Sequence, residues 1–249
     1  MAKATNYYIY GLNTVLSVLH NAAERVLQLS VDRTRQDSRM QQLIDTAQML
    51  GIKLQSVDAA LFDKQLGEVN HQGVMALVKP AVPLKEAQLL AQLEQLSRPA
   101  LLLVLDGVQD PHNLGACLRS ADCAGADALI VPRDRACGLT ATVCKVASGA
   151  AETVPFYTVT NLARSLRDLQ QVGVWCIGMA GEAEAEYFSL ELGGASAIVL
   201  GAEGRGLRRL TRETCDQLAR LPMLGSVSSL NVSVTAGVCL YEALRQRHG

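Results

Sequence analysis

The chain has 249 residues, a formal net charge of −1 and a hydrophobic fraction of 49%, which allow a sizeable core but give no overall nucleic-acid signature. Any contact with nucleic acid therefore has to depend on local basic patches. Seven cysteines without a Cys-x-x-Cys pair and four scattered histidines predict free thiols and no metal site. The polar first residues and the lack of an apolar run of membrane-spanning length predict a cytoplasmic protein with no membrane partner.

Residues 1–78 have the pattern of a small α/β domain. Apolar residues at helical spacing predict helices near residues 15–19, 40–50 and 59–66. Short apolar runs predict strands at residues 26–31, 53–57 and 74–78. Two prolines within residues 79–83 indicate a linker, for which we expect residues 79–98.

Residues 99–249 alternate between apolar strands and helices and form the second expected domain. We expect strands at residues 100–105, 128–131, 156–159, 174–179, 195–200 and 218–221. We expect helices near residues 114–124, 140–148, 161–171, 212–217 and 232–245. Nearly continuous apolar strands separated by helices predict an α/β fold with a mostly parallel sheet that is covered on both faces.

Three polar segments each begin where an expected strand ends. Residues 106–120 read Asp-Gly-Val-Gln-Asp-Pro-His-Asn-Leu-Gly-Ala-Cys-Leu-Arg-Ser, and residues 201–207 read Gly-Ala-Glu-Gly-Arg-Gly-Leu. Residues 221–234 read Leu-Pro-Met-Leu-Gly-Ser-Val-Ser-Ser-Leu-Asn-Val-Ser-Val. Polar loops between a buried strand and a buried helix are where α/β proteins bind ligands. The alternative is structural: Asn113 caps a helix that begins at Leu114, and Asn231 or Ser233 caps the last helix.

Two further patterns lie near these segments. Ser229 together with His112 and Asp106 does not indicate a serine hydrolase, because residues 225–229 lack the Gly-x-Ser-x-Gly elbow. A cluster of arginines follows the glycine-rich segment and indicates either contacts with RNA phosphates or a solvated helix face. Its members are Arg205, Arg208, Arg209 and Arg212.

The three segments, in this order, closely resemble the signature motifs of the SpoU/TrmH class of SPOUT methyltransferases, and the resemblance covers essentially the whole chain. It implies methyl transfer from S-adenosylmethionine to a ribose 2′-hydroxyl of RNA, without a metal. It also implies a deep trefoil knot involving residues 201–207 and 221–234, an N-terminal RNA-binding domain and a homodimer. The N-terminal residues that would meet phosphates are Arg33, Arg35, Arg39 and Lys64, for which a solvated charged face is the alternative.

Within the class, the resemblance implies a guanosine in the peptidyl-transferase region of 23S ribosomal RNA as the target. The partner would then be 23S rRNA or a large-subunit precursor. A transfer-RNA ribose methyltransferase with the same motifs is one alternative. A non-catalytic RNA-binding factor for ribosome assembly is the other, and the intact polar residues of the three motifs argue against it.

The resemblance also assigns roles to particular residues. The catalytic residues would be Arg119, Asn113, Glu203, Ser229 and Asn231. The cofactor contacts would be Gly201, Leu221, Leu230, Met179, Gly181 and Met223, and plain core packing is the alternative for the two leucines. Arg119 would act either as a general base or as a clamp on the neighbouring phosphate that stabilises the developing alkoxide, because a guanidinium resists deprotonation.

Overall fold

The computed structural model describes residues 6–248, which form two compact units. Unit 1 contains the described residues up to Val82 together with Leu139–Thr153. Unit 2 contains Pro83–Gly138 and the described residues from Val154 onward. In the described part of the chain, no helix has both the length and the apolar composition needed to cross a membrane.

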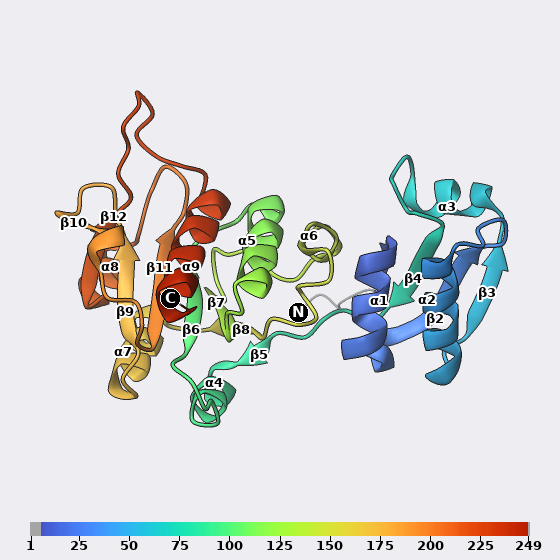
Figure 1. Cartoon of the computed structure of the whole chain (residues 1–249), viewed down its shortest axis with the longest axis horizontal. Helices are drawn as coiled ribbons and strands as arrows, with labels where there is room; N and C mark the ends of the chain where they lie inside the picture. The colour runs from blue at the N-terminus through green and yellow to red at the C-terminus, as the bar shows by residue number, and fades with distance from the viewer. Residues whose placement is uncertain (1–5, 249) are drawn as a thin grey trace. The chain divides into compact units, whose positions relative to one another are not determined.

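Unit 1 is built on a four-stranded sheet with the order β1-β4-β2-β3, of which Figure 1 labels β4, β2 and β3. Its strands are β1 (Tyr7–Tyr10), β2 (Val26–Asp32), β3 (Leu54–Val57) and β4 (Val74–Val78), and its helices are α1 (Leu12–Asn21), α2 (Ser38–Met49), α3 (Ala59–Leu66) and α6 (Ala141–Ala147). Strands β1 and β2 run antiparallel to β4, whereas β3 runs parallel to β2. The buried side chains of α1 and α2 form one core cluster with the sheet, and Phe62 of α3 belongs to a second, smaller cluster. Strand β1 was not expected from the sequence.

The segment Leu139–Thr153 packs against the edge strand β1 of unit 1. The ammonium of Lys145 lies 3.9 Å from the centre of the Tyr10 ring. Arg25 forms an ion pair with Glu152, and both side chains are largely buried. Burial is the main reason why the pKa of Glu152 is raised from its ordinary value. Unit 1 is therefore assembled from two stretches that are far apart in the sequence.

Unit 2 is built on an eight-stranded sheet with the order β10-β12-β9-β11-β6-β7-β8-β5 (Figure 1). Every pairing between neighbouring strands is parallel, which confirms the predicted sheet. The strands are β5 (Leu84–Lys85), β6 (Leu101–Asp106), β7 (Ala128–Pro132), β8 (Phe156–Val159), β9 (Trp175–Met179), β10 (Ala185–Glu186), β11 (Ser196–Gly201) and β12 (Gln217–Arg220). Because the strands are parallel, the loops that follow β6, β11 and β12 leave the same edge of the sheet.

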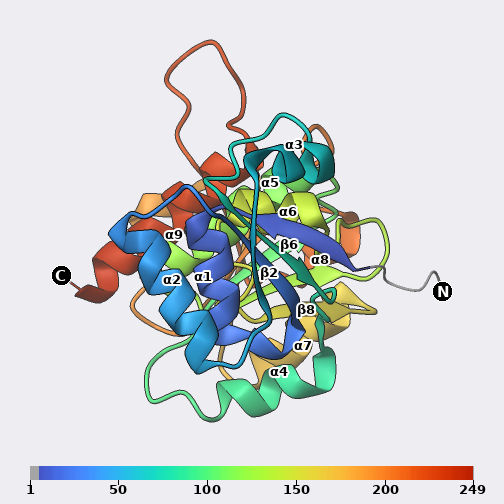
Figure 2. The same cartoon turned by 90° about the vertical axis from the view of Figure 1, so that its right-hand side faces the viewer.

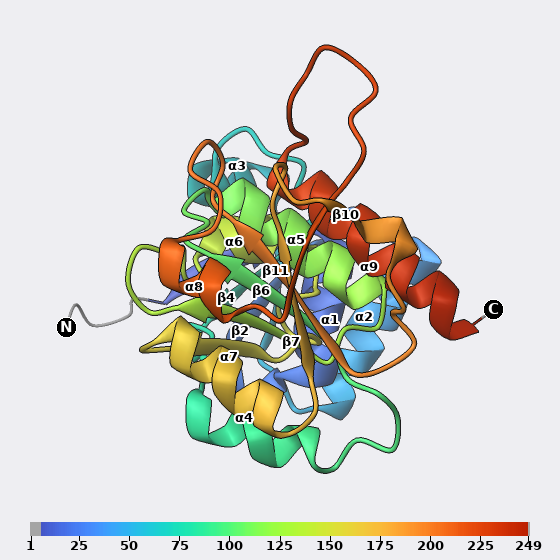
Figure 3. The same cartoon turned by 90° about the vertical axis from the view of Figure 1, so that its left-hand side faces the viewer.

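Helices cover both faces of this sheet. They are α4 (Glu86–Leu93), α5 (Pro111–Cys123), α7 (Leu162–Gln171), α8 (Arg209–Thr214) and α9 (Val232–His248). Helices α5 and α9 lie side by side (Figure 3), while α4 and α7 pack on the face formed by alternate buried residues of β6 and β7. Helix α8 ends at Thr214, earlier than the expected helix at 212–217, because the residues from Gln217 onward pair with β9 as a strand.

Candidate active site

A cavity of about 860 Å³ lies in unit 2 where β9, β11 and β12 end. The loop between β12 and α9 lines it and extends away from the rest of its unit in all three views (Figures 1, 2 and 3). All six expected cofactor contacts line this cavity: Met179, Gly181, Gly201, Leu221, Met223 and Leu230. Glu203, Ser229 and Asn231 line it as well. The structure thus brings together the second and third sequence segments.

The carboxylate of Glu203 joins all three segments through a single oxygen. Its Oε1 accepts hydrogen bonds from Nδ2 of Asn231 at 2.6 Å and from Nδ2 of Asn113 at 3.2 Å. The backbone N–H of Val232 lies 3.5 Å from the same oxygen. Hydrogen bonds to a charged acceptor are stronger than those between neutral groups, so Glu203 is suited to fix the two amides.

The amide of Asn231 uses its full hydrogen-bonding capacity within the protein. Its Nδ2 donates to Glu203 and also to Oδ1 of Asn113 at 2.9 Å. Its Oδ1 accepts from the backbone N–H of Ser233 at 2.9 Å and from the Ser233 hydroxyl at 2.6 Å. An amide group has two donors and one oxygen with two lone pairs, so this side chain has no free site for a ligand. Asn231 therefore caps α9 and orients its neighbours.

Asn113 does not cap a helix, so the expectation that it caps a helix beginning at Leu114 was wrong. Helix α5 begins at Pro111, and the side chain of Asp110 caps it by accepting from the backbone N–H of His112 at 2.8 Å. Asn113 is the third residue of the helix, within its first turn, and is buried. Its amide is consequently available for the contacts with Glu203 and Asn231.

Arg119 and Ser229 stand apart from this cluster. Arg119 is exposed on α5 and is not among the residues that line the cavity. Within residues 6–248 it forms neither a hydrogen bond nor an ion pair, so its guanidinium is available to a ligand. Ser229 lies in the exposed part of the β12–α9 loop and likewise has no hydrogen bond to another described residue.

Gly201 is required by the shape of the glycine-rich loop rather than by backbone flexibility. A Cβ atom at this position would lie 2.0 Å from the carbonyl carbon of Gly206. The loop closes tightly here because the backbone N–H of Gly206 donates to the carbonyl of Ala202 at 2.8 Å. The cavity wall at residues 201–206 therefore depends on a glycine at its first position.

Most of the arginine cluster beside this loop is paired with carboxylates. Arg208 contacts Asp106, Arg209 contacts Glu213 and Arg212 contacts Glu182. A further ion pair, Arg220 with Glu186 at 3.4 Å, lines the cavity and was not singled out from the sequence. Its only sequence signal is the position of Arg220 directly before the loop at residues 221–231.

Among residues 6–248, no group of three or more His, Cys, Asp or Glu side chains is arranged to hold a metal ion. The thiols in this range are unpaired, and those of Cys117, Cys144, Cys176 and Cys239 are buried. Burial raises the pKa of the Cys117 thiol to about 12. Such a thiol is almost entirely protonated near neutral pH and is a poor nucleophile.

Unit 2 has a fully parallel sheet, and loops at the ends of its strands line one cavity. The Glu203 carboxylate joins these loops. Such a site defines an α/β protein that binds its ligand at the carboxyl ends of its strands. Residues 100–241 match the SpoU rRNA methylase family, and the chain belongs to this family. Residues 8–84 match a second family, described as RNA 2′-O ribose methyltransferase substrate binding.

Relatives and solved structures agree with this assignment. The 23S rRNA (guanosine-2′-O-)-methyltransferase RlmB of Vibrio vulnificus is 53% identical over 243 residues, covering 98% of both chains. RlmB of Pasteurella multocida is 56% identical over 240 residues, covering 96% of this chain and 98% of its own. The crystal structure of an RNA 2′-O ribose methyltransferase has a TM-score of 0.79 at 30% identity, covering 99% of this chain and 90% of its own. The SpoU methyltransferase AviRb of Streptomyces viridochromogenes, in complex with AdoMet, shares the fold, with a TM-score of 0.79 at 23% identity over 98% of this chain and 91% of its own.

Proposed function

We propose that this enzyme transfers a methyl group from S-adenosylmethionine to the ribose 2′-hydroxyl of a guanosine in 23S ribosomal RNA, in its peptidyl-transferase region. The near full-length similarity to RlmB enzymes supports the reaction and the substrate. The observation in this structure that carries the proposal is the Glu203 carboxylate, which joins Asn113 and Asn231 beside the cavity.

The residues that line the cavity fit the cofactor. Leu221, Leu230 and Met223 supply an apolar surface that suits an adenine ring. Gly201 and Gly181 leave backbone groups accessible along the same wall. S-adenosylmethionine supplies a methyl group that is already strongly electrophilic, so the transfer does not require a metal ion to activate it.

The protein must orient the ribose and manage one proton. Ser229, which has a free hydroxyl beside the cavity, accepts the hydrogen bond of the 2′-hydroxyl. As the methyl group moves from sulfur to the ribose oxygen, the cofactor leaves as the neutral thioether and the hydroxyl proton passes by way of exposed Ser229 to solvent. Arg119 clamps the neighbouring phosphate and stabilises the alkoxide as it develops, because its guanidinium remains charged. Asn113, Glu203 and Asn231 hold the three catalytic segments in register.

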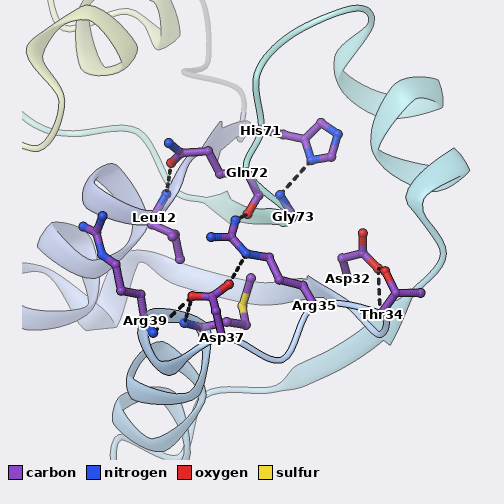
Figure 4. A network of polar contacts seen from close by, with 10 residues as sticks. Leu12, Asp32, Thr34, Arg35, Asp37, Arg39, His71, Gln72 and Gly73 are labelled. Atoms are coloured by element: carbon purple, nitrogen blue, oxygen red, sulfur yellow. Dashed lines mark hydrogen bonds and ion pairs between the residues drawn. The ribbon is translucent and has the colours of Figure 1, made fainter.

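The RNA-binding role belongs to the domain expected at residues 1–78, and the match of residues 8–84 to a substrate-binding family supports this role. Of the expected linker at 79–98, β5 and α4 belong to unit 2, and residues 139–153 of the expected methyltransferase domain at 99–249 belong to unit 1. Figure 4 shows that Arg35 is held between Asp37 and the backbone carbonyl of Gln72. Arg39 instead contacts the neutral amide of Asn13 at 2.6 Å and keeps its charge for phosphates.

The fold that the family resemblance implies adds two features to the proposal. The first is the deep trefoil knot of residues 201–207 and 221–234, supported by the position of both segments along one cavity. The second is a homodimer in the cytoplasm. Helix α9 presents a stripe of apolar residues at Val234, Val238 and Tyr241, of which Val234 is 49% and Tyr241 51% exposed. A helix that is apolar on several faces needs a further partner, and a second copy of the chain supplies it.

Sedimentation equilibrium tests the dimer. The double change Val234→Asp and Tyr241→Asp should convert the dimer to monomers. Leu210→Asp, a change at an exposed apolar residue of α8, should leave the dimer intact. A wild-type monomer at micromolar concentration would contradict the proposal.

Methyl transfer from labelled S-adenosylmethionine, mapped by nucleotide, tests the reaction. Unmodified 23S rRNA, large-subunit precursor particles and transfer RNA would be compared for the wild type and Arg119→Ala. We expect one labelled guanosine ribose in 23S rRNA and none in the variant. Labelling of transfer RNA alone would identify a different substrate. Absence of transfer to any RNA or particle would favour the assembly-factor alternative.

A further inference from the structure

The side chain of Asp106, at the carboxyl end of β6, is completely buried, and it has no part in the methyl transfer itself. Its side chain is 0% exposed, and both of its oxygens contact one residue. Oδ2 accepts from the backbone N–H of Arg208 at 2.9 Å, and Oδ1 accepts from Nε of the same arginine at 2.5 Å. Burying a carboxylate is costly unless it is paired and hydrogen-bonded, so this contact strongly favours one placement of Arg208.

Arg208 lies at the point where the glycine-rich loop ends. It is the residue that precedes α8, and residues 202–207 connect it to β11. At the other end of the loop, Gly201 pairs with Asp106 itself in the parallel register of β11 and β6. The backbone of Asp106 therefore holds the start of the loop, and its side chain holds the end.

The loop between these two anchors carries the groups that form the cavity wall. Glu203 extends from it to Asn113 and Asn231. The first atom of a side chain on Gly201 would already clash with Gly206, so the loop has little space in which to relax. A shift of Arg208 is consequently transmitted to Glu203 and to the cavity.

We propose that Asp106 is a positioning residue for methyl transfer. Through its contact with Arg208, it fixes the position of the 201–207 loop relative to the sheet. This inference rests on the proposed location of the cofactor in the cavity. Asp106 touches no substrate in this scheme. It acts by fixing where Glu203 and the backbone of Gly201 lie when the cofactor and the RNA bind.

The chain contains a matched control for the test. Asp127 is also a buried carboxylate, with its side chain 6% exposed, and it contacts Arg98 and the backbone N–H of Leu101. Leu101 begins β6 and Asp106 ends it, so the two carboxylates anchor opposite ends of one strand. Neither carboxylate lines the cavity itself, but only Asp106 contacts a residue at the end of the loop that forms the cavity wall.

The experiment compares Asp106→Asn and Asp127→Asn in the full-length protein. Calorimetry would measure the binding of S-adenosylmethionine, steady-state kinetics would measure kcat and KM with 23S rRNA, and thermal unfolding would measure stability. We expect both variants to lose stability. We expect only Asp106→Asn to weaken cofactor binding and to lower kcat/KM for the cofactor on the order of 100-fold, the effect of a misplacement of about 1 Å. The KM for RNA should not change.

Equal losses of stability with unchanged cofactor binding and kcat in both variants would overturn the proposal. Should Asp106→Asn fail to fold, Arg208→Gln tests the same contact from its exposed partner, whose side chain is 45% accessible, and should show the same selective loss. Leu230→Asp separates this proposal from the location of the site. If that variant still binds S-adenosylmethionine, the cofactor site is elsewhere, whatever the result for Asp106.

Discussion

The Nδ2 atom of Asn231 lies 2.6 Å from Oε1 of Glu203, and this contact joins the third sequence segment to the second. Both residues line the cavity of unit 2, yet Oε1 of Glu203 and Nδ2 of Asn231 are bonded to each other. Together with Asn113 they form a fixed frame beside the cavity, and the free groups of Ser229 and Arg119 remain for the substrate.

Asn231→Asp should make methyl transfer depend on pH in a new way. The substitution places a second carboxylate against Glu203, and two carboxylates that share a site bind one proton with a raised pKa. We expect kcat to fall on the order of 100-fold near neutral pH and to recover partly below about pH 6, where the pair holds a proton. Ser233→Ala, which removes only one hydrogen bond to Asn231, is the control and should keep the wild-type pH profile. A pH profile for Asn231→Asp parallel to that of the wild type would show that the two side chains do not interact in solution.

Gly201→Ala should destabilise unit 2 and abolish cofactor binding. The added methyl group would lie 2.0 Å from the backbone of Gly206, which no side-chain rotation can relieve. We expect a loss of about 3 kcal/mol or more in the free energy of unfolding, measured in urea. Gly193→Ala is the matched control, because nothing lies within 4 Å of a Cβ at that position. If Gly201→Ala had the stability of the wild type, the backbone of Gly206 would have to lie farther from residue 201 in solution.

Alkylation by iodoacetamide in the folded protein should occur first at Cys123. This residue is exposed, whereas burial raises the pKa of Cys117 to about 12 and that of Cys215 to about 12. The thiolate is the reacting species. Because their pKa values are raised, the thiols of Cys117 and Cys215 should therefore remain unmodified at mildly alkaline pH until the chain unfolds. Mass spectrometry of peptides after timed labelling checks the order. Early labelling of Cys215 would indicate local opening of α8.

Glu242 on α9 should contribute to stability at neutral pH but not in strong acid. Hydrogen bonds from Arg245 and Gln246 lower the pKa of its carboxyl to about 2. A lowered pKa in the folded state means that the stabilisation is present above the pKa of the unfolded chain and is lost as the pH falls toward 2. Urea unfolding of wild type and Glu242→Gln should therefore differ at pH 7 and converge with acidification. If the difference in stability did not depend on pH, it could not come from the ionisation of Glu242.

Local pattern was sufficient to predict most elements of the two units. The expected helix at residues 59–66 and strand at 74–78 coincide with α3 and β4, and the parallel sheet of unit 2 is confirmed. Short edge strands such as β5 and β10 escaped prediction because two residues carry no periodicity. Strand β1 was missed because four largely aromatic residues give little alternation of apolar and polar side chains.

The sequence by itself determined which residues have the chemistry of the site and that three polar segments follow strands of one sheet. Tertiary structure decided which of these side chains meet. The register of β6 with β11 pairs Asp106 with Gly201, and this pairing brings segments about 95 residues apart into contact. It also decided that Asn113 is a partner of Glu203 rather than a cap, and that residues 139–153 pack in unit 1. Contacts of this kind are set by strand order and packing between distant segments, whereas residue periodicity reports only the local environment of each segment.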